Sequence, residues 1–423
     1  IDGPLTTAGV LDLSSKKLLR VTTLGSLSAS NILMEADQLQ LQGAPGSITS
    51  GSGTTWIVPQ TPGTKIDLGS VSDSTANTLE ISNSELNTIG GSGTLRIGFA
   101  TYDKNGPAKS GDMLISAAIA PTFGGLVALE AGGGITQTAG GFTTNKLSLE
   151  SVEDLNLGMG NNVNHLAAKV GDASNTGRNF KFVNNQALNL AANLDGHSGI
   201  NVYPAGTFDP FEPQGVISLS ATGALTQSSG ALLTGNAVYA EGSNVDLTQH
   251  NPIGVVAGHS TGSTGGDMWH YSSSNAIYVT TVDGHAGITH DGAAGTMSIC
   301  LKAGSGGASQ DADAPLISML GDGVFMDTNG HVTFGSNSNN VGMVYGENTG
   351  AFTFINNASL TLGDGVHGIK PNNESIIVKA NGKLTIASPV DAGTSSVLLE
   401  AKNIDIGAFV NGSSIDMAAK QTS

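Results

Sequence analysis

Charged side chains are scarce in this 423-residue sequence, and arginine is the scarcest of them. Charged residues make up 12% of the chain, whereas an average globular protein has roughly 25%. The three arginines are Arg20, Arg96 and Arg178, and the formal net charge is −17 at pH 7. Binding to nucleic acid requires a basic surface that displaces counterions from the phosphates. The composition therefore excludes nucleic acid as a partner.

Cysteine, aromatic residues and long apolar runs are also scarce. Cys300 is the single cysteine, so no disulfide can form within the chain. Because the local alternation places Cys300 opposite Ile299 and Leu301, we expect a small side chain packed in a corner. The alternative is an exposed thiol that crosslinks chains. No run approaches the roughly 20 apolar residues that span a bilayer.

The residues that are present favour short β-strands. Apolar residues make up 39% of the chain and aromatic residues only 5%, so aliphatic side chains must form the core. Disordered chains lack such a supply, and glycine does not recur at every third position as collagen requires. Apolar residues at helical spacing are missing, whereas an aliphatic–polar–aliphatic tripeptide recurs between Gly, Asn, Asp and Ser, which is typical of strands with one buried face. The apolar pairs are Leu39/Leu41, Leu79/Ile81, Leu95/Ile97, Leu147/Leu149, Leu155/Leu157, Leu188/Leu190, Ile217/Leu219, Val245/Leu247, Ile277/Val279, Met297/Ile299, Val332/Phe334, Phe352/Phe354, Leu360/Leu362, Leu384/Ile386, Val397/Leu399 and Ile404/Ile406.

A longer repeat of about 80–90 residues accompanies this alternation from about residue 125 to residue 375. Residues 129–137 (LEAGGGITQ) match residues 219–227 (LSATGALTQ), and Asp195-Gly-His197 matches Asp283-Gly-His285. A third copy contains residues 339–346 (NNVGMVYG) and Asp364-Gly-Val-His367. Short strands, frequent turns and few aromatics suit a solenoid, in which each coil buries its aliphatic residues against the next coil.

We therefore predict an all-β fold, a parallel β-helix of very roughly 18–20 coils. Residues 1–124 begin the helix, residues 125–375 form three repeat units, and residues 376–423 form terminal coils and a tail. Residues 46–69 and 102–110 are predicted to be protruding loops, and residues 417–423 a frayed end. Asn at successive corners can form hydrogen-bonded ladders, for which Asn184 and Asn356 are candidates.

The repeat strings resemble those of a known group of proteins. Residues 129–137, 219–227, 161–168 (NNVNHLAA) and 339–346 are similar to repeats in filamentous-haemagglutinin-like exoproteins, which bacteria export by two-partner secretion. The resemblance implies a right-handed parallel β-helix, located outside the cell or on its outer surface. It also implies an outer-membrane secretion partner and an adhesive or structural role.

Three constellations are candidates for chemistry. The Asp-Gly-His segments could ligate a metal, but Asp-Gly is a strong turn signal, so we expect turns. The spaced carboxylates of residues 321–330 could bind Ca²⁺, although they fit neither an EF-hand nor the calcium-binding nonapeptide repeat. Asp311, Asp313 and Asp322 could serve a glycosidase, which needs two facing carboxylates, but we expect an exposed acidic loop.

The aromatic pairs offer a further alternative. Phe180/Phe182, Trp269/Tyr271 and Phe352/Phe354 could stack on sugars if they faced outward, but their alternation predicts core positions. We expect no catalytic residue, metal site or cofactor. The expected function is structural: a component of a bacterial surface fibre or adhesin shaft that assembles with itself, head to tail or laterally. A glycan- or host-receptor-binding adhesin and a β-helix carbohydrate-active enzyme remain the alternatives.

Overall fold

The chain folds as a parallel β-solenoid of about 17 turns with almost no helix, which confirms the predicted fold class. The computed structural model describes residues 1–99, 110–174, 176–204, 214–262, 268–291, 298–318 and 322–419. These residues belong to two compact units. Unit 1 comprises Ile1–Gly206 and Ser228–Ala231, and unit 2 comprises Thr207–Gln227 and Leu232–Ser423.

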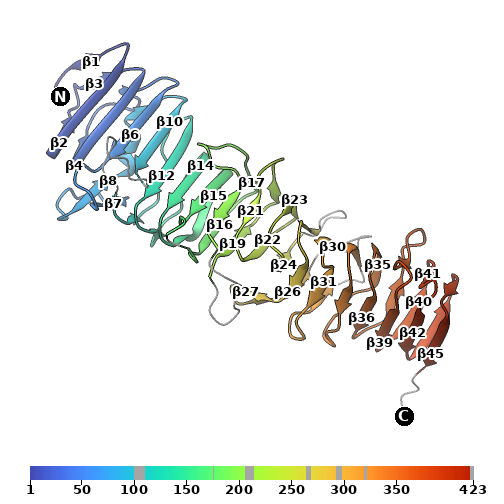
Figure 1. The fold of residues 1–423 in the computed structure, drawn as a ribbon. Coiled ribbons are helices and arrows are strands. Elements are labelled where there is room, and N and C mark those ends of the chain that lie inside the picture. The colour runs from blue at the N-terminus through green and yellow to red at the C-terminus, as the bar shows by residue number, and fades with distance from the viewer. Residues whose placement is uncertain are drawn as a thin grey trace. The chain divides into compact units, whose positions relative to one another are not determined.

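Unit 1 consists of short strands joined by tight corners (Figure 1). Its one helix is α1 (Asn83–Leu86), a single turn. The strands of unit 1 are β1 (Pro4–Thr6), β2 (Val10–Val21), β3 (Ser26–Ser28), β4 (Asn31–Leu41), β5 (Ile48–Thr49), β6 (Thr54–Val58), β7 (Lys65–Leu68), β8 (Thr78–Ile81), β9 (Ile89–Gly90), β10 (Thr94–Gly98), β11 (Met113–Ile115), β12 (Leu126–Ala131), β13 (Ile135–Gln137), β14 (Thr143–Ser151), β15 (Leu155–Val170), β16 (Phe180–Asn184), β17 (Leu188–Leu190) and β18 (Ile200–Val202).

The strands of unit 1 stack in parallel columns, one strand of each column per coil. One column runs β2, β4, β6, β10, β12, β14, and a second runs β8, β7, β11, β13. Strand β15 bends at a corner, so its beginning extends the second column and its end extends the first. Because the strands are in register, backbone N–H and C=O groups pair with the neighbouring coils and like positions lie above one another.

Unit 2 is built in the same way. Its strands are β19 (Val216–Ala221), β20 (Leu225–Gln227), β21 (Leu233–Thr234), β22 (Ala237–Gly242), β23 (Val245–Asn251), β24 (Val255–Ser260), β25 (Trp269–Ser273), β26 (Ile277–Val279), β27 (Thr281–Val282), β28 (His285–Ala286), β29 (Ile288–His290), β30 (Ile299–Ser305), β31 (Ala308–Gln310), β32 (Leu316–Ser318), β33 (Gly323–Asn329), β34 (Val332–Phe334), β35 (Met343–Asn348), β36 (Phe352–Asn356), β37 (Leu360–Leu362), β38 (Ile369–Lys370), β39 (Ile376–Ala380), β40 (Lys383–Ile386), β41 (Val390–Asp391), β42 (Ser396–Ala401), β43 (Asn403–Ile406), β44 (Val410–Asn411) and β45 (Ser414–Ala419).

Two columns contain most of the strands of unit 2. The first runs β19, β22, β24, β26, β31, β34, β36, β39, β42, β45. The second runs β20, β23, β25, β30, β33, β35. Strands β27 and β28 instead form an antiparallel hairpin.

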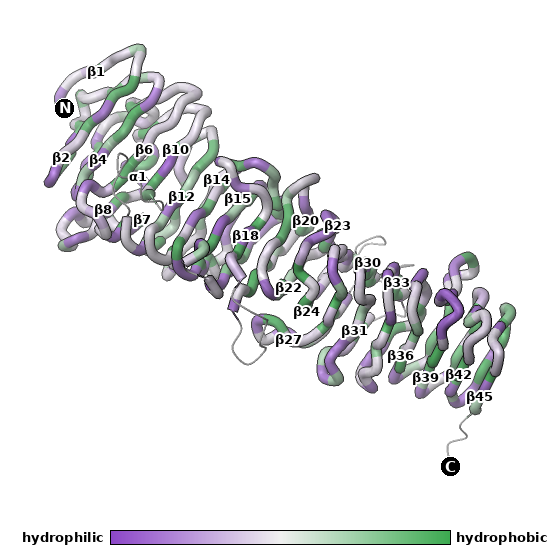
Figure 2. The backbone as a smooth tube through the Cα atoms, viewed as in Figure 1, coloured by the Kyte–Doolittle hydropathy of each residue, from purple (hydrophilic) through white to green (hydrophobic). Residues whose placement is uncertain are grey.

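The core contains the alternating residues that the sequence singled out, and Figure 2 shows apolar and polar positions succeeding one another along the coils. Met297 lies outside the described residues; the other predicted pairs all fall in strands, and all are buried except Ile404/Ile406 in the last coil. The three aromatic pairs are also buried. Trp269 donates its indole N–H to the carbonyl of Ala240, and the Tyr271 hydroxyl donates to that of Ile253. The pairs are core residues, so their interpretation as sugar-binding platforms is wrong.

Two predicted irregular segments are corrected by the structure. Residues 46–69 are not a loop, because they contain β5, β6 and β7, with Ile57 and Val58 in the core. These strands have only two to five residues, too few for a periodic pattern to stand out. The frayed end was predicted to begin too early in the chain, since Met417 belongs to β45 and pairs with Leu399 of β42. Residues 102–109 and 420–423 lie outside the described part of the chain.

Buried asparagines occupy recurring corners of the coils. Asn161, Asn184, Asn251, Asn339 and Asn356 have no exposed surface. The amide of each accepts a hydrogen bond from a backbone N–H and donates to backbone carbonyls. Asn184 is in register with Asn161, and Asn356 lies one coil from Asn339, so each of the two predicted corner asparagines has an asparagine in the neighbouring coil. The corners therefore satisfy backbone groups that the turning chain leaves unpaired.

Candidate functional site

The recurring Asp-Gly segments form tight turns, as predicted. Asp195 and Gly196 have φ angles of +54° and +81°, and Asp283 and Gly284 have +49° and +80°. Two consecutive positive φ values are typical of the type I′ hairpin turn, which Asp-Gly favours. Backbone hydrogen bonds of 2.8 and 2.9 Å between residues 194 and 197 close the first turn. The third segment turns differently, because the Asp364 carboxylate accepts the backbone N–H groups of residues 366 and 367.

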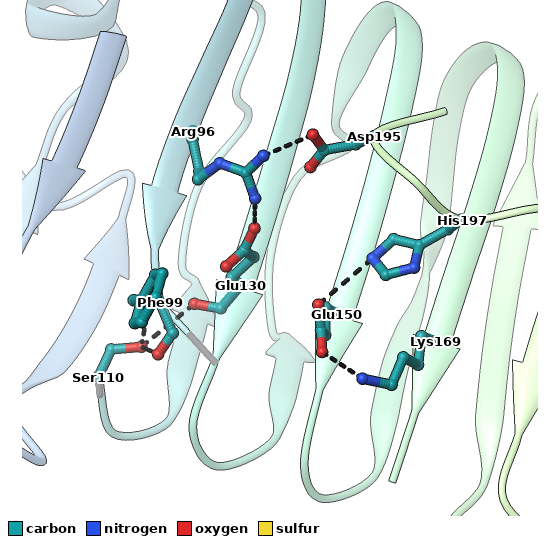
Figure 3. Close-up of polar contacts among 8 residues, drawn as sticks. All are labelled: Arg96, Phe99, Ser110, Glu130, Glu150, Lys169, Asp195 and His197. Atoms are coloured by element: carbon teal, nitrogen blue, oxygen red, sulfur yellow. Dashed lines mark hydrogen bonds and ion pairs between the residues drawn. The ribbon is translucent and has the colours of Figure 1, made fainter. Parts of the chain in front are cut away.

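The first turn lies against a row of charged side chains on the outer face of unit 1 (Figure 3). The contacts between the turn and this row involve Arg96, Glu130, Glu150 and Lys169 on the strands and Asp195 and His197 in the turn segment. Glu130 is in register with Glu150, and Glu150 with Lys169, on β12, β14 and β15. The three side chains therefore lie one coil apart, a spacing of roughly 4.8 Å.

Arg96 joins the turn to this row. Its guanidinium contacts the carboxylates of Glu130 on β12 and of Asp195 in the turn. The Glu130 side chain is only 4% exposed, so its charge depends on this partner. Residues 96 and 195 are 99 positions apart in the sequence, and the contact forms because the turn extends back across preceding coils.

Glu150 contacts a lysine and a histidine. Lys169 Nζ lies 2.7 Å from one carboxylate oxygen, and His197 Nε2 lies 3.3 Å from the other. Burial would raise the pKa of Glu150, but the hydrogen bonds from His197 and Lys169 outweigh it and lower the pKa to about 2. Glu150 is therefore a permanent anion at neutral pH.

This arrangement is suited to holding the turn rather than to proton transfer. Glu130 and Glu150 are neighbouring carboxylates, as a glycosidase requires. However, a general acid needs a raised carboxyl pKa, whereas the pKa of Glu150 is lowered. Both carboxylates are occupied by cations of the same chain.

Sequence reasoning missed the charged row itself. The available signal was the Leu-Glu dipeptide repeated at 129–130 and 149–150, whose alternation places each glutamate on the outer face. The ion pair between Glu130 and Arg96 could not have been inferred from the sequence.

Unit 2 repeats the arrangement with other side chains. Ser218 on β19 donates its hydroxyl to the Asp283 carboxylate, and the His285 ring stacks on Tyr239 of β22 at a centroid distance of 3.9 Å. Farther along the chain, His367 stacks on Tyr345 of β35, with ring centroids 6.1 Å apart. Each Asp-Gly segment thus packs against its own set of outer side chains.

The predicted metal candidates do not assemble into a ligand set. Within the described ranges, no group of three or more His, Cys, Asp or Glu side chains is placed to hold a metal ion. In the 321–330 segment, Gly321 lies outside the described residues, Asp322 is buried 3.8 Å from His290, and Asp327 is exposed on β33.

The acidic trio 311, 313 and 322 is not one exposed loop. Asp311 accepts hydrogen bonds from the hydroxyls of Tyr278 and Thr280, and Asp313 is exposed. Asp322 is buried, 2% exposed, which corrects the expectation for this residue.

Cys300 is a packed residue. It is 1% exposed, and burial raises the pKa of its thiol to about 12. The crosslinking alternative is therefore wrong, because a buried, protonated thiol is unreactive.

Comparisons with known proteins identify no relative. No family model, curated protein or solved structure matches the chain. Among the described residues, no helix combines the length and apolar character needed to cross a membrane. The fold class, a parallel β-solenoid repeat protein, is thus the classification that the structure provides.

Proposed function

We propose that this protein is a structural component of a bacterial extracellular or cell-surface fibre, or the shaft of an adhesin. The observation that carries the proposal is the continuous in-register stacking of coils in each unit, whose recurring Asp-Gly turns are bound to the protein's own outer faces. Export through an outer-membrane partner rests on the resemblance of the repeats alone. The proposal includes no catalytic residue, cofactor or nucleic-acid partner.

The last described coil supports assembly with another coil. Among the described strands, β43, β44 and β45 pair only with β40, β41 and β42. Ile406, Phe409 and Ile415 in this coil are 55%, 56% and 45% exposed. Ile386 and Val397, the equivalents of Ile406 and Ile415 one coil earlier, are buried. A coil added to this edge would cover these side chains and pair the open backbone groups.

In the head-to-tail version, the added coil is the first coil of a second copy. Strand β2 of that coil carries exposed Lys16, Lys17 and Arg20 against one exposed acid, Asp12. The last coil carries exposed Asp416, and Asp405, which already pairs with Lys383 of the preceding coil. Their opposite charges favour this orientation. A head-to-tail contact does not close on itself, so it produces filaments.

Electron microscopy of the full chain over a range of concentrations tests this proposal. We expect filaments with a meridional spacing of roughly 4.8 Å. Phe409→Asp should shorten or abolish them, whereas Val71→Asp, at a site that is 88% exposed in unit 1, should not. Particles of one chain at every concentration would show that self-assembly is wrong, and equal effects of both variants would show that the end coil is not the contact.

A further inference from the structure

The unit 2 counterpart of Lys169 is a histidine. In unit 1, Glu150 is in register with Lys169 on the next coil. In unit 2, Glu241 on β22 is in register with His259 on β24. The amine of a lysine stays charged throughout the neutral range, whereas an imidazole titrates within it. The same outer position therefore carries a permanent cation in one unit and a titratable group in the other.

His259 connects three consecutive coils. Its Nε2 lies 2.6 Å from the Asp291 carboxylate, which follows β29, and its Nδ1 lies 3.6 Å from the Glu241 carboxylate on β22. Strand β29 is in turn the neighbour of β24. Both ring nitrogens can donate only when the imidazole is protonated. In the neutral ring, one nitrogen presents a lone pair to a carboxylate.

His259 lies between two carboxylates, Glu241 on β22 and Asp291 after β29. Glu241 also accepts the hydroxyls of Tyr239 and Ser220, at 2.8 and 3.2 Å. From the β27–β28 hairpin, His285 covers the Tyr239 ring and Asp283 binds Ser218. Glu241, Asp291 and Asp283 are thus the anions that face this position. The other imidazoles on the packed elements are His285 in the hairpin and His290 on β29, which is buried 3.8 Å from Asp322.

The electrostatics agree with this geometry. The nearby Glu241 carboxylate raises the pKa of His259, burial opposes the rise, and Asp291 reinforces it. The His259 ring, against the effect of burial, lowers the pKa of Glu241 to about 2. Glu241 therefore remains charged while His259 titrates.

We propose that His259 is a proton-dependent tie in the wall of unit 2, which joins β22, β24 and the segment after β29 when protonated and releases one carboxylate when neutral. This inference goes beyond the structural role proposed above, and it stands whether or not filaments form. Of the nine histidines, only His165 and His197 lie in unit 1.

The direction of the pH dependence of stability follows from the pKa shifts of His259 and Glu241. A raised folded pKa for His259 gives stability that is fully present below its ordinary value of 6.5 and is lost as the pH rises through the folded pKa. The lowered pKa of Glu241 gives stability present above 4.5 and lost as the pH falls toward about 2. The tie is strongest between these limits, from pH 4.5 to 6.5.

Hydrogen exchange measured by mass spectrometry at about pH 5.5 and about pH 9, corrected for intrinsic rates, tests the tie in the full chain. We expect amides of β24 and β29 to exchange roughly two- to fivefold faster at the higher pH, the range that partly exposed ion pairs support. Amides of β4 and β6 in unit 1 should not change.

Two variants make the test specific. His259→Lys reproduces the unit 1 arrangement and should keep protection at both pH values, whereas His259→Gln should show the faster exchange at both. Unchanged exchange of β25 and β30, which directly follow β24 and β29 and pair with each other in the other column of unit 2, verifies that each variant is folded. Equal pH dependence in wild type and both variants would overturn the proposal, as would wild-type protection in His259→Gln at the lower pH. Filament formation is read separately by microscopy, so either proposal can fail alone.

Discussion

Replacing a single buried corner asparagine should loosen several coils of unit 1. The Asn161 amide accepts the backbone N–H of Phe142 at 2.8 Å and donates to the carbonyls of Leu157 and Val183, each at 3.0 Å. It has no exposed surface. Asn161→Ala leaves two buried backbone groups and one partly buried carbonyl without this partner, and each buried group left unpaired costs about 1–3 kcal/mol. Allowing for relaxation and water entry, we expect a loss of about 3 kcal/mol.

Asn161→Asp should cost more than the alanine variant. The carboxylate can still accept the Phe142 N–H, but it has no N–H to donate to the two carbonyls, and it places a charge in a buried corner. Asn164→Ala is the matched control. Asn164 is exposed on the same strand and bonds only the side chains of Asn145 and Gln186 among its described partners, so we expect a change within about 0.5 kcal/mol.

A local assay is required, because coils of a solenoid need not unfold together. Hydrogen exchange of β13, β15 and β16 reports the corner directly. A loss of about 3 kcal/mol corresponds to exchange on the order of 100-fold faster. Equal exchange in Asn161→Ala and Asn164→Ala would refute the reasoning, since it would mean that water replaces the corner amide at no cost.

Three further outcomes follow from the ion pairs and the thiol. Arg96→Ala should lower the local stability of unit 1 by about 3 kcal/mol, measured by hydrogen exchange of β10 and β12, because it leaves the buried Glu130 carboxylate without its partner. Lys65→Ala, from an exposed pair, should change stability by less than about 0.5 kcal/mol, and similar effects of the two variants would contradict this. The Glu150 contribution, with a pKa lowered from 4.5 to about 2, should be present above pH 4.5 and lost as the pH falls toward 2. Glu150→Gln should flatten this part of the acid dependence of exchange in β14, and an unchanged profile would argue against it. Cys300, with a pKa of about 12, should resist maleimide in the native protein near neutral pH and react once the chain is unfolded, and rapid native labelling detected by mass would show that it is accessible.

Much of the fold could be predicted from local patterns. The pair Leu147/Leu149 shows why: in a strand, residues two apart face the same side, so alternation alone places both in the core. The same rule placed Phe180 and Phe182 inward. The Asp195-Gly turn was predictable because both residues tolerate positive φ. Such inferences require only a few consecutive residues, and the physics they rest on is local.

The candidate site depended on the stacking of coils. Arg96 meets Asp195 because the intervening coils and turn set the rise and direction of the chain, and no local pattern encodes that path. The role of Asn161 was likewise hidden, since an asparagine can turn a corner exposed to water or satisfy backbone groups inside it. Alternation by itself determined which side chains face inward, whereas only the tertiary structure decided which outward ones meet, because those contacts depend on the length of every coil between them.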